Sequence, residues 1–277
     1  MDSKCRQLKQ EGWCLVERMF SEAEVDAYLS HYMAMRQTSQ PGDDWPYEPE
    51  ASDPLRRYPR IIHPHKFDQK SLDFMIDPRI GEFFKSALGK EPFAVQTMIY
   101  FKPAGSRGQA LHQDQTYLRV QPGTCYAAWL ALDDCDEENG CLEIVPGTQD
   151  LPILCNIEAD LTKSFTHDTV PLPPGSKPMP VKMKAGDVLF FNGSIIHGSG
   201  PNSSANRFRR SLIGHYADGD CAAIGDFYKE AWTFEGEQIN LDISAHTTTC
   251  GEFVEENGNT LVKLREPVKS SIPKGPH

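Results

Sequence analysis

The spacing of apolar residues changes near residue 93, from a helical repeat to the alternation expected of strands. Before this point, the spacing predicts helices over 3–11, after Ser21, and over 71–76 and 78–88, with a short strand over 13–16. Ser21 and Glu24 form a capping-box pattern, and Asp77 is a candidate N-cap followed by proline. The first third of the chain is therefore predicted to be largely helical.

Beyond residue 93, short apolar runs alternate with turn signals rich in glycine, proline and asparagine. They predict strands over 95–102, 110–119, 126–132, 141–145, 181–183, 188–191, 195–198 and 208–216. Many short strands at close spacing are typical of a sandwich or jelly roll. Two segments break the pattern: the Pro-, Gly- and Asp-rich stretch 40–54, expected to be a loop, and the interruption 149–180, which has several prolines.

The expected fold is mainly β with α additions: a double-stranded β-helix (jelly roll, cupin-like) buttressed by N-terminal helices. We expect one domain over 1–277, with a helical part to about residue 92, a jelly-roll core over about 93–217, and a C-terminal extension over 218–277.

Composition narrows the classes of function. The 28 basic and 39 acidic residues give a net charge of −11, which disfavours nucleic acid as a partner. We find no signal-peptide pattern and no apolar run long enough to cross a membrane. The eight cysteines include no CxxC pair, so we expect reduced thiols in a cytoplasmic protein, with Cys125 and Cys141 packed inside strands. A monomer and a homodimer are both compatible with the sequence.

The candidate chemistry begins with His112 and Asp114. Residues two apart on a strand project to the same face, so the two side chains would point together. His197, on a later predicted strand, would complete two imidazoles and one carboxylate, the ligand set of non-haem Fe(II) oxygenases. His-x-Asp alone is weak evidence, because most histidines in a chain with nine of them are surface or core residues.

Two arginines follow His197 on the next predicted strand. An Fe(II) centre that activates O2 needs two electrons beyond those of a substrate C–H bond, and 2-oxoglutarate can supply them. Its distal carboxylate then needs a fixed, bidentate cation, which an inward-facing arginine provides better than lysine. Arg209 and Arg210 are the candidates, while Arg207 is expected in the preceding turn.

The chain resembles the phytanoyl-CoA dioxygenase family of Fe(II)/2-oxoglutarate oxygenases. Five blocks in the family's order carry the resemblance, from a first block that starts at Gln96: QTMIYFKPAG, LHQDQTY, WLALDD, ENGCLEIVPGT and HGSGPNSS. It implies that His112, Asp114 and His197 bind iron, and that Fe(II), 2-oxoglutarate and O2 are used together.

The resemblance also assigns the cosubstrate site. It implies that Arg209, helped by Ser199, holds the distal carboxylate of 2-oxoglutarate, with Met98 and Trp129 lining the same pocket. The turn before the arginines is one residue longer than usual in the family, which leaves Arg210 as an alternative. Arg209 is preferred because the Arg-Ser-Leu that follows it matches the family's ending.

Strand alternation near these blocks gives four candidates for contacts with the substrate, each with ordinary strand packing or a surface position as the alternative: Gln96, Tyr100, Gln115 and Tyr117. Arg60, His65 and Trp232 lie in segments that close over the site in related enzymes, and a structural role is their alternative.

The expected activity is hydroxylation of an unactivated C–H bond in a small molecule, with release of succinate and CO2. An alkaloid or amino-acid-derived specialised metabolite is our first hypothesis, since an acyl-CoA would favour a basic patch. Asp114 also matters here, because related halogenases carry a small residue in place of the carboxylate. The rivals are desaturation, epimerisation or ring formation at the same centre, an acyl-CoA hydroxylase, and a non-enzymatic iron or 2-oxoglutarate sensor.

Overall fold

A computed structural model of the chain describes residues 1–37, 47–245 and 249–265. Its helices are α1 (Asp2–Glu11), α2 (Glu22–Met35), α3 (Pro54–Arg57), α4 (Gln69–Met75), α5 (Pro78–Leu88) and α6 (Gln115–Leu118), with one-turn 3-10 helices at Pro64–Lys66 and Asp226–Tyr228. Among these residues, no helix is both long and apolar enough to span a membrane. The loop predicted over 40–54 lies partly outside the described residues.

Two antiparallel sheets form the core, which confirms the mainly β, jelly-roll prediction. The large sheet runs in the order β1-β10-β5-β12-β3-β14-β15, with β2 also paired to β3. Its strands are β1 (Trp13–Val16), β2 (Ile61–Ile62), β3 (Phe93–Lys102), β5 (Cys125–Ala131), β10 (Val188–Asn192), β12 (Arg209–Ala217), β14 (Glu230–Trp232) and β15 (Gln238–Asn240).

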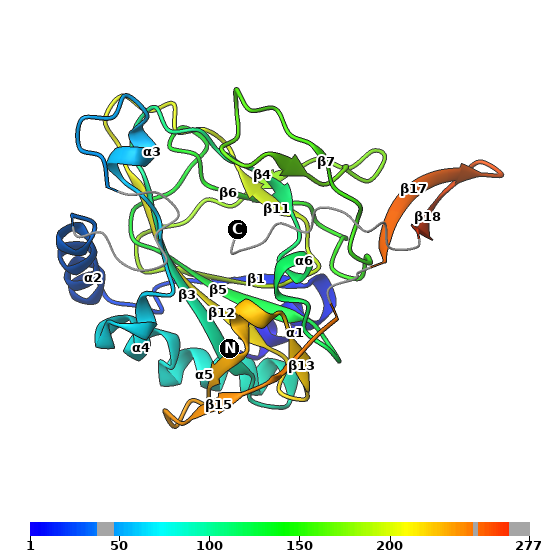
Figure 1. The fold of residues 1–277 in the computed structure, drawn as a ribbon, viewed down its shortest axis with the longest axis horizontal. Helices are drawn as coiled ribbons and strands as arrows, with labels where there is room; N and C mark the ends of the chain where they lie inside the picture. Colours follow the sequence, from blue (N-terminus) through cyan, green and yellow to red (C-terminus); the bar gives the residue numbers. More distant parts are fainter. Residues whose placement is uncertain (38–46, 246–248, 266–277) are drawn as a thin grey trace.

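The small sheet supplies the facing layer, in the order β4-β11-β6-β9. Its strands are β4 (Gln109–His112), β6 (Leu142–Ile144), β9 (Met179–Pro180) and β11 (His197–Ser199). A buried apolar cluster that includes Met98, Trp129 and Phe191 fills the space between the two sheets. A second cluster fills the space between the large sheet and the helices α1, α2, α4 and α5, and Figure 1 shows α4 and α5 on the face of that sheet that points away from the small sheet.

The helix boundaries follow from their caps. Ser21 and Glu24 make both hydrogen bonds of the capping box at the start of α2. Asp77 accepts the Arg79 amide at the start of α5, and Gly89 ends that helix in the left-handed region at φ 82°. Ile80, Phe83 and Phe84 then form the apolar face of α5, which packs against the sheet.

Two predicted strands are wrong in extent. The run 110–119 is one strand only as far as His112, after which the chain turns into α6. Near 181–183 the described pairing consists of β9 and an isolated bridge between Cys135 and Met183. The interruption 149–180 contains β9 and a small hairpin of β7 (Ile157–Glu158) and β8 (Asp168–Thr169).

The C-terminal extension adds strands to the large sheet and packs against the small one. Strands β14 and β15 extend the large sheet, and β13 (Ala223–Ile224) pairs with β16 (Asp242–Ile243). A hairpin of β17 (Cys250–Glu256) and β18 (Asn259–Arg265) projects from the body in Figure 1. Its Phe253 and Val262 pack with Leu111 and Ile196 on the outer side of the small sheet.

The cysteine prediction needs correction. Cys155 and Cys250 form a disulfide, because a bridge between Leu154 and Gly251 brings their Cα atoms to 4.9 Å. Spacing alone could not reveal this pair, which is 95 residues apart in sequence. The other six cysteines are free and buried: Cys125 begins β5, and Cys141 directly precedes β6.

Candidate metal centre

Three buried side chains converge at one end of the small sheet. His112 ends β4 and pairs in register with His197 at the start of β11, and Asp114 lies just beyond β4. One potential ligand atom from each lies within 4.8 Å of the others. The Asp114 Oδ1 is 3.6 Å from His112 Nε2 and 3.5 Å from His197 Nε2. The sequence therefore identified the residues that the fold brings together.

The geometric reason given for Asp114 was wrong. Asp114 is not on a strand, because its backbone has helical angles, φ −60° and ψ −32°. Its carbonyl accepts the Tyr117 and Leu118 amides, and the Gln115 amide donates to the Gly193 carbonyl at 3.0 Å. A helical turn, held against the chain just before His197, aims the carboxylate at the two imidazoles.

Each histidine has one ring nitrogen fixed by the backbone. His112 Nδ1 lies 2.8 Å from the Ala110 carbonyl oxygen, and His197 Nδ1 lies 3.1 Å from that of Ile195. A carbonyl only accepts, so each Nδ1 carries a hydrogen and each Nε2 is the nitrogen that faces Asp114. Two imidazoles and one carboxylate with fixed orientation fit a divalent iron ion.

His215 holds the second oxygen of the Asp114 carboxylate. Its Nε2 lies 3.2 Å from Asp114 Oδ2, and both side chains are buried. Sequence reasoning missed this residue. The signal was present, because strand alternation places Arg209, Ser211, Ile213 and His215 on one face of β12.

A cavity beside the three residues contains the predicted cosubstrate positions. Met98, Trp129, Ser199 and Arg209 all line it. Its lining also includes Phe191, at the end of the apolar strand before His197, and residues that the sequence did not single out: Gln109, Leu142, Gly198 and Ile213. The Gln109 Nε2 lies 3.3 Å from His112 Nε2. Leu142, Phe191 and Ile213 make part of the wall apolar.

Arg209 is fixed on three sides. Its Nε donates to the Gly140 carbonyl at 3.1 Å, and its terminal nitrogens donate to Ser211 Oγ at 3.1 Å and Ser199 Oγ at 3.4 Å. Its guanidinium also lies over the Trp129 ring, 5.4 Å from the centroid. Burial lowers the pKa of Arg209. The result is a preorganised cation in the cavity wall.

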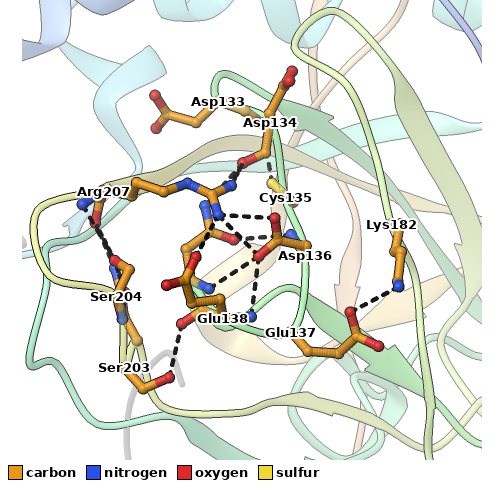
Figure 2. Close-up of polar contacts among 12 residues, drawn as sticks. Asp133, Asp134, Cys135, Asp136, Glu137, Glu138, Lys182, Ser203, Ser204 and Arg207 are labelled. Carbon is orange, nitrogen blue, oxygen red and sulfur yellow. Dashed lines mark hydrogen bonds and ion pairs between the residues drawn. The ribbon is translucent and has the colours of Figure 1, made fainter.

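The neighbouring arginines face elsewhere. Arg210 pairs with Asp133, with a shortest distance of 2.6 Å. Arg207 pairs with Asp136 and Glu138 at 2.8 and 3.0 Å, and Figure 2 shows this network on the loop that precedes β6. These pairs hold the turn before β12 on the surface, so that of the three arginines Arg209 is the one in the cavity wall.

The four candidate substrate contacts have different surroundings. Tyr100 lines the cavity, and its hydroxyl accepts a 2.8 Å hydrogen bond from Arg60. Tyr117 is half-buried, with its ring 6.3 Å from that of His112. Gln96 is fully buried opposite His215 on β12, and its amide has no hydrogen-bond partner among the described residues.

Gln115 does not reach the site. Its amide donates to the Val120 carbonyl at 2.8 Å and accepts the Cys125 amide at 3.1 Å. The expectation based on strand alternation fails here because the residue sits on α6 instead of a strand. The side chain fastens the turn that follows the helix.

Among the closing-segment residues, two have clear structural surroundings. His65 Nδ1 lies 2.8 Å from Thr97 Oγ1, and burial lowers the pKa of His65 to about 3. Trp232 packs with the core between the helices and the large sheet. Arg60 is nearer the cavity, through its hydrogen bond to Tyr100 and its position 5.7 Å from the Phe165 ring centroid.

Comparison with known proteins places this geometry in a family. The model of the phytanoyl-CoA dioxygenase (PhyH) family matches residues 8–211, which contain the three converging side chains and Arg209. The chain belongs to this family. Its enzymes use Fe(II), 2-oxoglutarate and O2, so the cofactor prediction is confirmed at the level of the family.

The curated relatives bear the same name. Peroxisomal phytanoyl-CoA dioxygenase of Rattus norvegicus is 25% identical over 78% of this chain and 68% of its own length. Phytanoyl-CoA dioxygenase 1 of Oryza sativa subsp. japonica is 32% identical over 50% of each chain. The chain thus spans between half and about two thirds of these relatives.

Solved structures support the fold. The α-ketoglutarate-dependent epimerase SnoN from nogalamycin biosynthesis superposes with a TM-score of 0.63, at 20% identity over 84% of both chains. EvdO2 from Micromonospora carbonacea var. aurantiaca also gives 0.63, at 21% identity over 79% of this chain and 93% of its own. At this identity the likeness concerns the jelly-roll architecture.

Proposed function

We propose that this family member is a hydroxylase that inserts oxygen into an unactivated C–H bond of a small molecule, with release of succinate and CO2. One observation carries the proposal: the Asp114 carboxylate completes a three-residue cluster with two fixed imidazoles, beside a cavity whose wall holds a buried arginine. Two imidazoles and a carboxylate on one face leave positions open for a cosubstrate.

Each residue has a role in this proposal. His112, Asp114 and His197 hold Fe(II), and His215 orients the carboxylate through its second oxygen. Arg209 and Ser199 bind the distal carboxylate of 2-oxoglutarate, while Met98 and Trp129 line its pocket. When bound, iron with 2-oxoglutarate and O2 supplies the oxidising power. The apolar wall excludes water from the reacting atoms.

Asp114 also selects the reaction type. A carboxylate in this position fills the place that a halide would need, so halogenation is disfavoured. Tyr100 and Gln96 are the proposed substrate contacts, because Tyr100 lines the cavity and the buried Gln96 amide has hydrogen-bonding capacity to offer. Tyr117 is proposed as a third contact, since its ring lies 6.3 Å from that of His112.

The proposed substrate is a specialised metabolite, such as an alkaloid or an amino-acid derivative. The net charge of −11 favours this over an acyl-CoA, whose phosphates a negative surface repels. The names of the curated relatives keep an acyl-CoA as the rival. Epimerisation and ring formation are second candidates, since two structural neighbours are described as an epimerase and a carbocyclase from nogalamycin biosynthesis.

A cytoplasmic location stays a prediction. The Cys155–Cys250 disulfide is unusual for a reducing compartment, and curated mammalian relatives are described as peroxisomal. Subcellular fractionation of the tagged protein, with thiol labelling of the same fraction, would decide both the compartment and the state of this pair.

The test is turnover with a panel of substrates. Purified protein is incubated with Fe(II), ascorbate, 2-oxoglutarate and candidate metabolites or acyl-CoAs, and succinate and oxidised product are measured together. We expect one class to accelerate succinate formation and to gain one oxygen atom per succinate. A product of unchanged oxygen content would favour epimerisation or ring closure, and no acceleration by any compound would favour the sensor.

The ligand assignment has its own test. Asp114→Ala is expected to abolish iron-dependent 2-oxoglutarate turnover, by a factor of at least about 1,000, because a carboxylate ligand is lost. Asp160→Ala, in an exposed loop, is the matched control and should keep full turnover. Full activity in Asp114→Ala would show that the metal is held elsewhere.

A further inference from the structure

Two buried basic side chains lie next to each other at the cavity, Arg209 in its wall and Lys102 outside its lining. Lys102 and Arg209 face each other in the β3–β12 register and are only 2% and 4% exposed. Their hydrogen bonds go to carbonyl and hydroxyl oxygens, and no carboxylate within the described ranges pairs with either. Buried charges without a counterion cost free energy, so this pair is suited to a ligand that brings a negative charge.

The Lys102 ammonium has three acceptors. Its Nζ donates to Gly200 O at 2.7 Å, to Ser199 Oγ at 2.8 Å and to Gly140 O at 3.2 Å. Burial and the nearby Arg209 lower the pKa of Lys102, whereas its three oxygen partners favour the charged form. As an ammonium it has three donors, so none is left for a ligand. Lys102 is also absent from the cavity lining, whereas Ser199 belongs to it. Lys102 therefore stands behind Ser199.

Ser199 is surrounded by donors. Besides the Lys102 ammonium, its oxygen accepts from the Gln109 amide at 3.3 Å and from the Arg209 guanidinium at 3.4 Å. With Lys102 in its charged form, none of these groups can accept a hydrogen bond. The single hydrogen of the Ser199 hydroxyl must then point to some other acceptor, and the open side of the residue is the cavity.

We propose that Lys102 is a positioning residue for the cosubstrate: it fixes the Ser199 hydroxyl so that its hydrogen points at the distal carboxylate of 2-oxoglutarate. The proposal rests on the proposed roles of Ser199 and Arg209 in binding that carboxylate. Lys102 acts through Ser199 and makes no direct contact with the ligand.

The backbone around Lys102 supports this arrangement. The Gly140 carbonyl accepts from both Lys102 and Arg209, and so joins the two side chains in one network. Gly140 has φ +72°, and a Cβ there would lie 2.5 Å from the Gly200 carbonyl oxygen, the other acceptor of Lys102. The close approach of these two glycines sets the two carbonyls that hold the ammonium beside Ser199.

The experiment is a double-mutant cycle on ligand binding. Kd is measured without O2 on Mn(II)-loaded protein, for 2-oxoglutarate and for 2-oxobutyrate, which lacks the distal carboxylate. Lys102→Gln keeps donors for the two glycine carbonyls, so it serves beside Lys102→Met in case the latter does not fold. Lys182→Met, which removes a surface ion pair with Glu137, is the matched control.

We expect Ser199→Ala and Lys102→Gln each to raise the Kd of 2-oxoglutarate about tenfold, the scale of a hydrogen bond to a charged group. The double variant should be no weaker than the single Ser199→Ala, and 2-oxobutyrate should bind equally to all variants. Additive effects, or equal losses for both ligands, would overturn the positioning role. If Arg209→Met left the Kd of 2-oxoglutarate unchanged, the proposed cosubstrate site itself would fail, independently of Lys102.

Discussion

The two ends of the β3–β12 pair differ in how their buried polar groups are satisfied. At one end, Lys102, Ser199 and Arg209 share one hydrogen-bond network, and the Ser199 hydrogen and part of the Arg209 guanidinium are left for a ligand. At the other end, about 20 Å along the strand, Gln96 is fully buried with neither amide atom paired among the described residues.

Neighbours of Gln96 share this property. Neither ring nitrogen of His63 has a hydrogen-bond partner in the described ranges, and the Tyr228 hydroxyl has none there either. The two rings lie 5.9 Å apart, and His63 is 5.2 Å from His65. Burial lowers the pKa of His63 well below its usual range. His63 and His65 are thus uncharged at neutral pH.

The comparison indicates which end of the strand pair is preorganised for a ligand. The end at Arg209 has a defined charge and a fixed donor geometry, as expected for a cosubstrate that never varies. The end at Gln96 carries hydrogen-bonding capacity without a committed partner, which costs stability and suits a water or a substrate group. Three predictions test this contrast.

The largest effect is expected at the charged end. Arg209→Met should raise the KM for 2-oxoglutarate at least about a hundredfold, because a buried bidentate partner of a carboxylate is lost. Arg210→Met is the control: it breaks the pair with Asp133, so it should lower stability slightly and leave that KM unchanged. A larger KM effect in Arg210→Met would reverse the assignment of the two arginines.

An intermediate effect is expected from Gln96→Leu. Replacing an unpaired buried amide with an apolar side chain of similar size should raise the free energy of unfolding by about 1–3 kcal/mol. The same change should impair turnover of the true substrate while leaving 2-oxoglutarate binding intact. Thermal unfolding and KM measurements check the two parts, and a loss of stability would mean that an ordered water already satisfies the amide.

The smallest effect is expected in how the free energy of unfolding depends on pH. Burial holds the pKa of His65 near 3, against 6.5 in the unfolded chain, so the unfolded state binds more protons between these values. Stability should therefore fall as pH drops below 6.5, by at most about 1.4 kcal/mol per pH unit for each such histidine. His63 shifts in the same direction, so His65→Asn should remove one of two proton equivalents, measured by urea unfolding at pH 7 to 5.

The sequence predicted most of the regular helices and strands, but few of the turns and short helices between them. Helices with recognisable caps, such as the one that starts after Ser21, and long alternating strands such as β3 and β12 lie close to their predicted bounds. Their hydrophobic pattern and their tertiary burial agree. The short stretch 113–119 was assigned to a strand because its helix is held by tertiary contacts, such as the one to Gly193, that periodicity does not record.

Site residues show the same limit. The motifs identified His112, Asp114, His197 and Arg209, whose side chains do gather around one cavity. Lys102 lay within a quoted motif without a role, because its meaning depends on the Gly140 and Gly200 carbonyls, which are distant in sequence. The partner of Cys155 is equally invisible, since eight cysteines allow many pairings.

The hydrogen bonds from the two histidines to carbonyls two residues upstream have a consequence for how this site tolerates change. In many metal sites a carboxylate side chain fixes the imidazole, and a single substitution removes it. Here the acceptors are the main-chain oxygens of Ala110 and Ile195. Every amino acid carries that oxygen, so the side chains at both positions can be varied without unlocking either imidazole. Each strand therefore fixes its own histidine through its main chain. Its outward-facing side chains can be redesigned while the same Nε2 atom still faces Asp114.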